Sequence, residues 1–289
     1  MRFCLLLICF AAYSCSPSFA NPYEVKDLRV VAMIAEPPEA APGDSVTMTV
    51  YYADPGNSGT RIVDSRFGTC HNEDPNEDCV PNLETILSDH AAVTTRIDDI
   101  LTDTYRYVVP NNIFDGASLI EQFYGVYADV FVHANNSIRT IDALKRVVVT
   151  PAKVQPKNKN PRLLGFDILY QDIKIGDETF LPALNRATAY TLKPRYDASS
   201  LEAYQIIDYN QQVHILKEEP SFIWSCSEHC TLDRNTSYNN ETITLTPPLT
   251  ENTDNALTVH VVMRDGRGGE AFVAARVVLL PEVKVSATQ

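Results

Sequence analysis

The stretch that decides the fold reads Leu257-Thr-Val-His-Val-Val-Met-Arg264, then Asp265-Gly-Arg-Gly-Gly269, then Ala274-Ala-Arg-Val-Val-Leu-Leu-Pro281. Valine-rich runs of this length favour β-strands, and a cluster of glycines between them favours a reversal of the chain. A glycine-rich loop that binds phosphate leads from a strand into a helix, whereas here a second valine-rich run follows. The stretch therefore predicts a β-hairpin in which Arg264 and Asp265 pair or cap the turn.

The same pattern occurs once before, at Tyr127-Ala-Asp-Val-Phe-Val-His-Ala134, Asn135-Asn-Ser137 and Ala143-Leu-Lys-Arg-Val-Val-Val-Thr-Pro151. Upstream of each hairpin lies an aromatic residue followed by a cysteine, which are Phe67 and Cys70, then Trp224 and Cys226. In an immunoglobulin-like sandwich such a hairpin is the last of the domain, and a tryptophan like Trp224 packs between the sheets. The repeat therefore predicts an all-β chain of two tandem immunoglobulin-like antiparallel β-sandwiches.

The two sandwiches are predicted to span residues 21–152 and 161–285. Between them, the linker at 153–160 is rich in Pro, Lys and Asn and has no apolar alternation, which is typical of a semi-rigid, solvated connection. Apolar alternation at Leu28–Ile34 and Val46–Tyr52, interrupted by prolines, predicts the first antiparallel strands. Residues 71–100 and 111–123 fit no clean strand, and we expect them to form long loops of the first sandwich.

The first twenty residues predict export. The apolar run from Phe3 to Tyr13 is shorter than the roughly twenty residues that span a bilayer, so it is typical of a removable signal. Two processing sites remain open. Cleavage after Ala20 would start the mature chain at Asn21 and secrete it. Lipoprotein processing would instead make Cys15 the acylated N-terminus, followed by a polar tether, and would hold the protein at the outer membrane or in the periplasm.

Beyond the N-terminal segment that contains Cys4, Cys9 and Cys15, the chain has an even number of cysteines. In an exported protein such cysteines commonly pair as disulfides. Spacing predicts two local bridges, Cys70–Cys79 and Cys226–Cys230, each closing a small loop. Zinc is the alternative, because a histidine adjoins one cysteine of each pair. A Cys-His pair without a second nearby ligand is nevertheless a poor tetrahedral set, so no metal ligand is assigned.

The formal net charge of −13 argues against a nucleic-acid partner, because binding phosphates needs a positive surface. It also argues against electrostatic adhesion to anionic lipid, so attachment to a membrane would rest on the N-terminal lipid anchor. The sequence lacks the motifs of serine hydrolases, zinc proteases and phosphate-binding loops. We therefore predict no catalytic residues and no cofactor. Calcium stays open, because the carboxylates near Asp74–Asp78 and Asp98-Asp99 lack the spacing of a calcium loop.

Several motifs together resemble a family. They are Asp27-Leu-Arg-Val-Val-Ala32, Glu36-Pro-Pro-Glu-Ala-Ala-Pro-Gly-Asp-Ser-Val-Thr47, Ser221-Phe-Ile-Trp224, Pro247-Pro248 and Val261-Val-Met-Arg-Asp-Gly-Arg-Gly-Gly269. This order resembles uncharacterised two-domain lipoproteins of myxobacteria and related predatory or surface-gliding bacteria, and its last part resembles immunoglobulin-like modules of the PKD and cadherin-like kind. The resemblance implies a surface or periplasmic lipoprotein and assigns no reaction.

These observations predict a cell-envelope lipoprotein that acts as a non-catalytic binding or structural module with a protein or polysaccharide partner. The alternative is a secreted enzyme or protease inhibitor that acts through the long loops of the first domain. Loops at one end of an immunoglobulin-like sandwich commonly carry recognition. The acidic loop between Cys70 and Cys79 is therefore the candidate recognition surface for a basic partner. Its acidic residues are Glu73, Asp74, Glu77 and Asp78.

Overall fold

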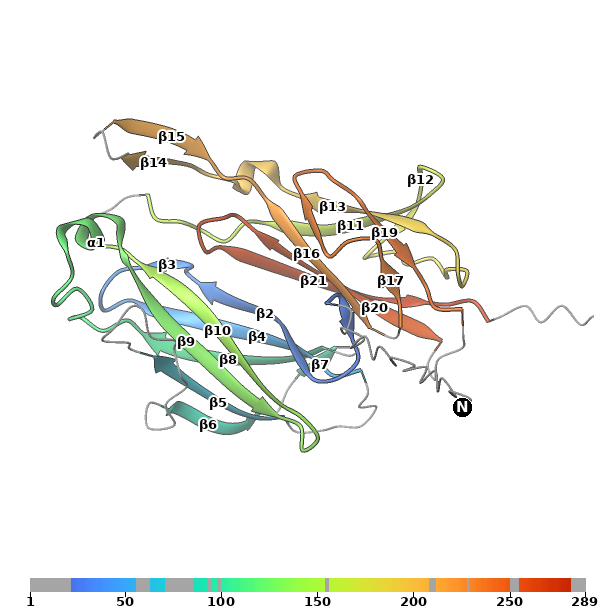
Figure 1. Cartoon of the computed structure of the whole chain (residues 1–289), viewed down its shortest axis with the longest axis horizontal. Coiled ribbons are helices and arrows are strands. Elements are labelled where there is room, and N and C mark those ends of the chain that lie inside the picture. Colours follow the sequence, from blue (N-terminus) through green and yellow to red (C-terminus); the bar gives the residue numbers. More distant parts are fainter. Residues whose placement is uncertain are drawn as a thin grey trace, which may run out of the picture.

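The structure is a computed structural model of the chain, and it describes residues 22–55, 63–70, 86–92, 95–97, 100–153, 156–207, 212–227, 229–249 and 255–281. Nearly all of the regular structure in these residues is β-strand, as the sequence predicts. Figure 1 shows two β-sandwiches that lie side by side, with the first (blue to light green) below the second (yellow to red). The prediction of an all-β fold with two tandem sandwiches is confirmed.

The first sandwich consists of two sheets. In chain order its strands are β2 (Arg29–Glu36), β3 (Glu39–Ala40), β4 (Ser45–Ala53), β5 (Val63–Cys70), β6 (Ile86–Ala92), β7 (Thr95–Ile97), β8 (Ile100–Val108), β9 (Val126–Asn135) and β10 (Thr140–Val149). One sheet has the order β2-β4-β8-β7 and the other β3-β10-β9-β5-β6. The predicted antiparallel pairing of the first two long strands is confirmed, because β2 pairs with β4 along most of its length.

The second sandwich has the same plan. Its strands are β11 (Leu163–Tyr170), β12 (Ile173–Asp177), β13 (Tyr190–Tyr196), β16 (Ser221–Ser227), β17 (Thr231–Leu232), β18 (Thr236–Tyr238), β19 (Ile243–Thr246), β20 (Ala256–Arg264) and β21 (Glu270–Val278). One sheet has the order β12-β11-β13-β19-β17, and the other contains β16-β20-β21 with β18 beside β16. The strands β14 (Ala203–Ile207) and β15 (Val213–Lys217) form a separate two-stranded ribbon between β13 and β16.

The strand order is that of an immunoglobulin-like fold. In such a domain the first, second, fifth and fourth strands form one sheet, and the third, sixth and seventh form the other. In the first sandwich β2-β4-β8-β7 and β5-β9-β10 take these places, and in the second β11-β13-β19 and β16-β20-β21 do so. The two hairpins that repeat in the sequence, β9–β10 and β20–β21, are therefore the last hairpins of their sandwiches, as predicted.

Each sandwich has its own core, and a smaller apolar cluster lies between them. Trp224 is fully buried in the second core, where its ring meets Phe166 edge-on with centroids 5.9 Å apart, so its predicted packing role is confirmed. Val25, Ala53 and Ile100 form the cluster between the sandwiches, packed against Tyr51 and Phe272 among others. Tyr51 comes from the first sandwich and Phe272 from the second, and their ring centroids are 4.5 Å apart.

The short strand β1 (Glu24–Val25) departs from the predicted division of the chain. It precedes the first sandwich and lies within the predicted unit 21–152, yet it pairs in parallel with Cys226 and Ser227 of β16. The reason is that Val25 is buried in the cluster between the sandwiches. β1 therefore belongs to a sheet of the second sandwich.

Two predicted loops contain regular structure. The range 71–100 includes β6 and β7, and the range 111–123 includes most of α1 (Leu119–Tyr124). The helix begins with a capping box, because the Ser118 hydroxyl accepts from the Glu121 backbone N–H while the Glu121 carboxylate accepts from the Ser118 N–H. No helix among the described residues combines the length and hydrophobicity of a membrane span.

Candidate binding surface at the domain junction

The turn between β20 and β21 reaches across to the first sandwich. Its Arg267 guanidinium lies 3.2 Å from the Glu39 carboxylate on β3, 3.0 Å from Glu218 and 3.8 Å from Glu202. Glu39 and Glu218 are buried, and the Arg267 side chain is mostly covered. A guanidinium with several donors can satisfy more than one carboxylate at once. We call Glu39, Asn158, Glu202, Glu218, Asp265 and Arg267 the junction cluster.

The turn itself is shaped by Asp265. Its buried carboxylate accepts hydrogen bonds from the backbone N–H groups of Arg267 at 2.7 Å and Gly269 at 3.0 Å, which confirms the predicted cap. Its second oxygen accepts from the Asn158 side chain at 2.9 Å. A Cβ on Gly269 would lie 2.1 Å from that carboxylate, so only glycine fits there. Because Gly269 has no Cβ, the Asp265 carboxylate fits inside the turn and accepts hydrogen bonds from its backbone N–H groups.

The predicted linker is part of the junction rather than a solvated spacer. The backbone N–H of Asn158 donates to Glu39 at 2.8 Å, and the residue is buried. The Lys157 ammonium donates to the Thr150 hydroxyl at 2.7 Å. The expectation of a solvated linker is therefore wrong at these two residues, because carboxylate and carbonyl acceptors from both sides surround them.

A second ion pair also crosses between the sandwiches. Lys145 on β10 lies 3.1 Å from Glu270 on β21 and donates to the Gly268 carbonyl at 3.0 Å, and both side chains are about nine-tenths covered. Burial lowers the pKa of Lys145, while Glu270 opposes this shift. Burial also raises the pKa of Glu218, against the opposing effects of a backbone N–H and Arg267. Buried charges of this kind tolerate little rearrangement, because separating them leaves an uncompensated charge.

The ribbon β14–β15 projects from the second sandwich (Figure 1), and its base contacts this cluster. At its base the Glu202 N–H donates to the Glu218 carboxylate at 2.8 Å, and the Glu218 N–H donates to the Glu202 carbonyl at 3.0 Å. Arg267 stacks over the ring of Tyr204 on β14, with its Cζ 4.7 Å from the ring centroid. The base of the ribbon is therefore held by the same arginine that binds Glu39.

The outer strand of the ribbon exposes aliphatic side chains. Every residue of β15 is exposed, and Val213, Ile215 and Leu216 expose 58%, 72% and 39% of their surfaces. On the first sandwich, α1 likewise exposes 84% of Leu119 and 70% of Ile120. Exposed aliphatic groups gathered on a protruding element commonly mark an interaction site.

The helix and the ribbon flank the junction cluster from opposite sandwiches. Gly125 ends α1 with a positive φ of 96°, and a Cβ there would lie 2.6 Å from the Val149 carbonyl oxygen. Thr150, which follows Val149, donates a hydrogen bond from its hydroxyl to the Glu39 carboxylate at 2.6 Å. Because Glu39 binds Arg267 and Arg267 holds the ribbon, a continuous set of contacts connects α1 to β14–β15. We regard these elements and the junction cluster as the candidate binding surface.

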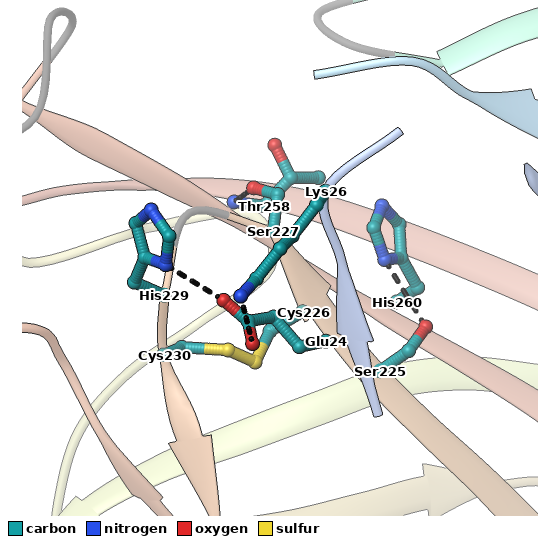
Figure 2. Close-up of a disulfide and its surroundings, with 9 residues drawn as sticks. All are labelled: Glu24, Lys26, Ser225, Cys226, Ser227, His229, Cys230, Thr258 and His260. Carbon is teal, nitrogen blue, oxygen red and sulfur yellow. Dashed lines mark hydrogen bonds and ion pairs between the residues drawn. A yellow bond between two sulfur atoms is a disulfide. The ribbon is translucent and has the colours of Figure 1, made fainter. Parts of the chain in front are cut away.

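The predicted Cys226–Cys230 disulfide (Figure 2) is confirmed. It lies at the end of β16 opposite to the ribbon. Cys226 pairs with Val259 at the start of β20, whereas Ser221, next to the ribbon, pairs with Arg264 at its end. Figure 2 shows Glu24 of β1 between Lys26 and His229, at 3.1 Å and 2.9 Å. These contacts attach the N-terminal strand to the disulfide loop.

The other predicted site residues lie outside the part of the chain that the structure describes. They are Cys15, the side chain of Cys70, Cys79 and the acidic residues Glu73, Asp74, Glu77 and Asp78. The first disulfide, the lipid on Cys15 and the acidic recognition loop therefore stay predictions. In the described ranges no group of three or more His, Cys, Asp or Glu side chains is placed to hold a metal ion.

A cavity of about 380 Å³ lies between β1–β2 and β10. Its charged lining residues are Glu24, Lys26, Asp27, Arg29, Arg139 and Asp142, which balance in sign. Arg139 pairs with Asp27 at 3.2 Å, and Arg29 donates to the Pro22 carbonyl at 2.8 Å. The lining therefore favours neither an anion nor a cation, and it assigns no ligand.

Sequence reasoning missed the junction cluster and the ribbon. The signal for the ribbon was present, because Tyr204-Gln-Ile-Ile207 and Val213-His-Ile-Leu-Lys217 are β-prone runs separated by the polar residues 208–212. The signal for the junction was weaker. Nothing in the sequence indicates that Glu39 and Arg267 meet.

Comparisons with known proteins find similar solved structures but no related sequence. No protein-family model matches the chain, and no curated protein matches it. The Ig1-2 module of the Drosophila receptor protein tyrosine phosphatase DLAR is 8% identical over 88% of this chain and all of that chain, with a TM-score of 0.27. The D00-D0 domain of Intimin is 11% identical over 89% of this chain and all of that chain, with a TM-score of 0.26.

A third similar structure is the Yersinia pseudotuberculosis adhesin InvE, which is 12% identical over 85% of this chain and 58% of that chain, with a TM-score of 0.20. Scores this low carry no argument about relationship or function. The assignment of the fold rests instead on the strand order of the two sandwiches.

Proposed function

We propose that this protein is an exported, non-catalytic binding module of the cell envelope, held at a membrane by a lipid on Cys15. Its binding surface consists of the ribbon β14–β15, the helix α1 and the junction cluster between them. The observation that carries the proposal is the exposure of Val213, Ile215 and Leu216 on a ribbon whose base is fixed by buried charges. A fixed base limits the conformational entropy that binding removes.

The position of the ribbon within the fold supports a binding role. It lies between the second and third strands of its sandwich, and the Arg267 turn lies between the sixth and seventh. In immunoglobulin variable domains the loops at these two places lie at one end and bind antigen. The ribbon and turn of this chain also lie together, as the stacking of Arg267 on Tyr204 demonstrates.

The course of the N-terminal strand supports outward presentation of this surface. β1 pairs at the disulfide end of β16, and the ribbon leaves from the opposite end of that strand. Only a few residues separate Cys15 from Pro22. A lipid on Cys15 would therefore hold the disulfide end near the membrane and leave the ribbon end away from it. The resemblance of the sequence to surface lipoproteins of myxobacteria agrees with this location.

The anchor is tested with Cys15→Ser in the producing cell. We expect the wild-type protein in the membrane fraction and the variant in the soluble exported fraction. Metabolic labelling with a palmitate analogue gives an independent readout, because the label should depend on Cys15. Equal membrane partitioning of both proteins would overturn the anchor without bearing on the binding surface.

The binding surface is tested with Ile215→Lys on β15 and a matched control, Ile173→Lys on β12. The two isoleucines are similarly exposed, at 72% and 68%, but β12 lies at the other end of the second sandwich (Figure 1). Immobilised mature protein is incubated with detergent-solubilised envelope, and the retained proteins are compared. We expect Ile215→Lys to lose ligands that Ile173→Lys retains. Identical profiles for the two variants would overturn the proposed surface.

A further inference from the structure

The ribbon β14–β15 lacks the third strand that such an element normally needs. An isolated two-stranded hairpin is at best marginally stable in water, whereas three or more strands with an apolar face are stable. Within the described residues β15 pairs with β14 and with no other strand. No further strand of the described residues therefore lies along β15, whose aliphatic side chains are exposed.

The exposed edge is also poorly protected against pairing. Natural edge strands discourage association with inward-pointing charges, prolines or bulges. β15 reads Val213-His-Ile-Leu-Lys217, with its one lysine at the base and aliphatic residues through the middle. Its register with β14 is regular over all five residue pairs, from Ala203 opposite Lys217 to Ile207 opposite Val213. A strand without a bulge can accept a further strand.

We infer that β15 pairs antiparallel with β15 of a second copy of this chain, so that two ribbons form one four-stranded sheet. This inference rests on the proposed function, because it takes the ribbon as a binding surface and names its partner. A two-fold symmetric pair buries the same surface of both copies and closes without forming a filament.

The sequence of β15 is complementary to itself, which favours a second copy of the chain as the partner. Antiparallel pairing centred on Ile215 places Ile215 opposite Ile215 of the second copy, Val213 opposite Lys217, and His214 opposite Leu216. No two like charges lie directly opposite each other, which would destabilise the pair. On the face that carries Ile215, the aliphatic stem of each lysine can cover the valine of the other copy. The strand thus fits its own copy with all five residues paired.

The junction cluster prepares the ribbon for this pairing. Glu202 and Glu218 bond to each other across the base of the ribbon, and Arg267 holds both Glu218 and the Tyr204 ring. The direction of the ribbon is thereby fixed relative to the sandwich. The second strand meets a preformed edge, so less ordering is required on association.

Association is tested by sedimentation velocity of the purified mature chain over a concentration series. We expect a monomer–dimer equilibrium in the wild type and in the Ile173→Lys control. Ile215→Lys places two lysines opposite each other and removes two buried isoleucines, which should weaken the dimer about a hundredfold. Removal of the signal takes away Arg2 and no acidic residue, so each mature copy stays strongly negative and salt should strengthen the dimer. A wild type that stays monomeric throughout would overturn the inference.

The register is tested by disulfide crosslinking of introduced cysteines. Opposed residues of an antiparallel pair have Cα atoms about 4.5–5.5 Å apart, within the range that a disulfide bridges. Ile215→Cys should therefore form a covalent dimer alone. Val213→Cys should crosslink with Lys217→Cys only when the two variants are mixed. The wild type under the same oxidation gives the background from the cysteines already present.

The outcomes separate this inference from the proposed function. A monomeric wild type whose ribbon variant still loses an envelope ligand would disprove self-pairing and leave the binding surface in place. A dimer that survives Ile215→Lys, or crosslinks at Val213→Cys alone, would place the contact between copies elsewhere and overturn the inference. A dimer with the predicted crosslinks and no other ligand would support self-pairing and limit the proposed function to it.

Discussion

Arg267 in the last turn of the second sandwich and Glu39 in the first sandwich lie 3.2 Å apart, although 228 residues separate them in sequence. The pair is covered by protein and is accompanied by the Lys145–Glu270 pair, which also crosses between the sandwiches. Together with the apolar cluster around Val25, these contacts join the two sandwiches along their sides. We therefore expect the sandwiches to unfold as coupled units, with Arg267 as a main source of the coupling.

Arg267→Ala should destabilise the protein by about 3 kcal/mol, because it leaves Glu39 and Glu218 buried without their cation. The measurement is urea unfolding followed by tryptophan fluorescence, which reports the core around Trp224. Arg162→Ala is the control. Its side chain is 71% exposed and lies 3.9 Å from Asp197, so the change should stay within about 0.5 kcal/mol. Equal effects of the two substitutions would contradict a structural role for the cluster.

The raised pKa of Glu218 predicts a specific dependence of stability on pH. Because the folded state holds the proton more tightly than the unfolded state, the contribution of Glu218 to stability falls as the pH rises above its unfolded pKa of 4.5. Glu218→Gln does not titrate. The wild type should therefore lose stability relative to Glu218→Gln as the pH increases from 4 to 7, measured by urea unfolding at each pH.

Glu121→Gln provides a control of opposite sign. The Ser118 backbone and side chain lower the pKa of Glu121, so its ionised form stabilises the folded state. The wild type should gain stability relative to Glu121→Gln over the same pH increase. The same slope for both variants would show that global charge, rather than the local surroundings of Glu218, sets the dependence.

Truncation of Val25 tests the pairing of β1 with the second sandwich. Val25→Ala removes buried methyl groups from the cluster between the sandwiches and should cost about 2 kcal/mol. Val108→Ala on β8 is the matched control, because Val108 is 55% exposed. The free energy of unfolding of each variant is the measurement. If both changes are neutral, β1 contributes nothing to the contact between the sandwiches.

Removal of the Cys226–Cys230 disulfide tests its contribution to stability. The bridge closes a loop of only a few residues, so the double substitution to alanine should lower the free energy of unfolding by about 2 kcal/mol. Mass spectrometry of non-reduced peptides establishes the bridge in the wild type first. A wild type that melts at the same temperature with and without reductant would disagree with this expectation.

The parts of the fold that depend on local pattern were predictable. Alternation identifies β2 and β4, and the glycines with Asp265 identify the turn between β20 and β21. The short helix α1 was missed because six residues show no helical period, although its Ser118-x-x-Glu121 capping box is a recognisable signal.

The candidate surface depends on contacts that no local pattern contains. Asn158 and Lys157 look solvated by composition, yet they bind Glu39 and the Ala40 carbonyl, which come from a distant part of the chain. The pairing of β1 with β16 has no signal in a strand of two residues. From sequence alone, charged residues at a domain junction are predicted to be exposed, because their partners come close only in the folded protein.

The pairing of Glu24 with Cys226 constrains the order in which this protein can fold. β1 is synthesised before either sandwich, yet its partner strand β16 lies in the last third of the sequence, so β1 can pair only after most of the polypeptide has been made. Contacts between residues so far apart in sequence form late, because the conformational entropy of closing a long loop is lost before the contact stabilises the chain. Until then Val25 lacks the apolar neighbours that bury it in the folded protein.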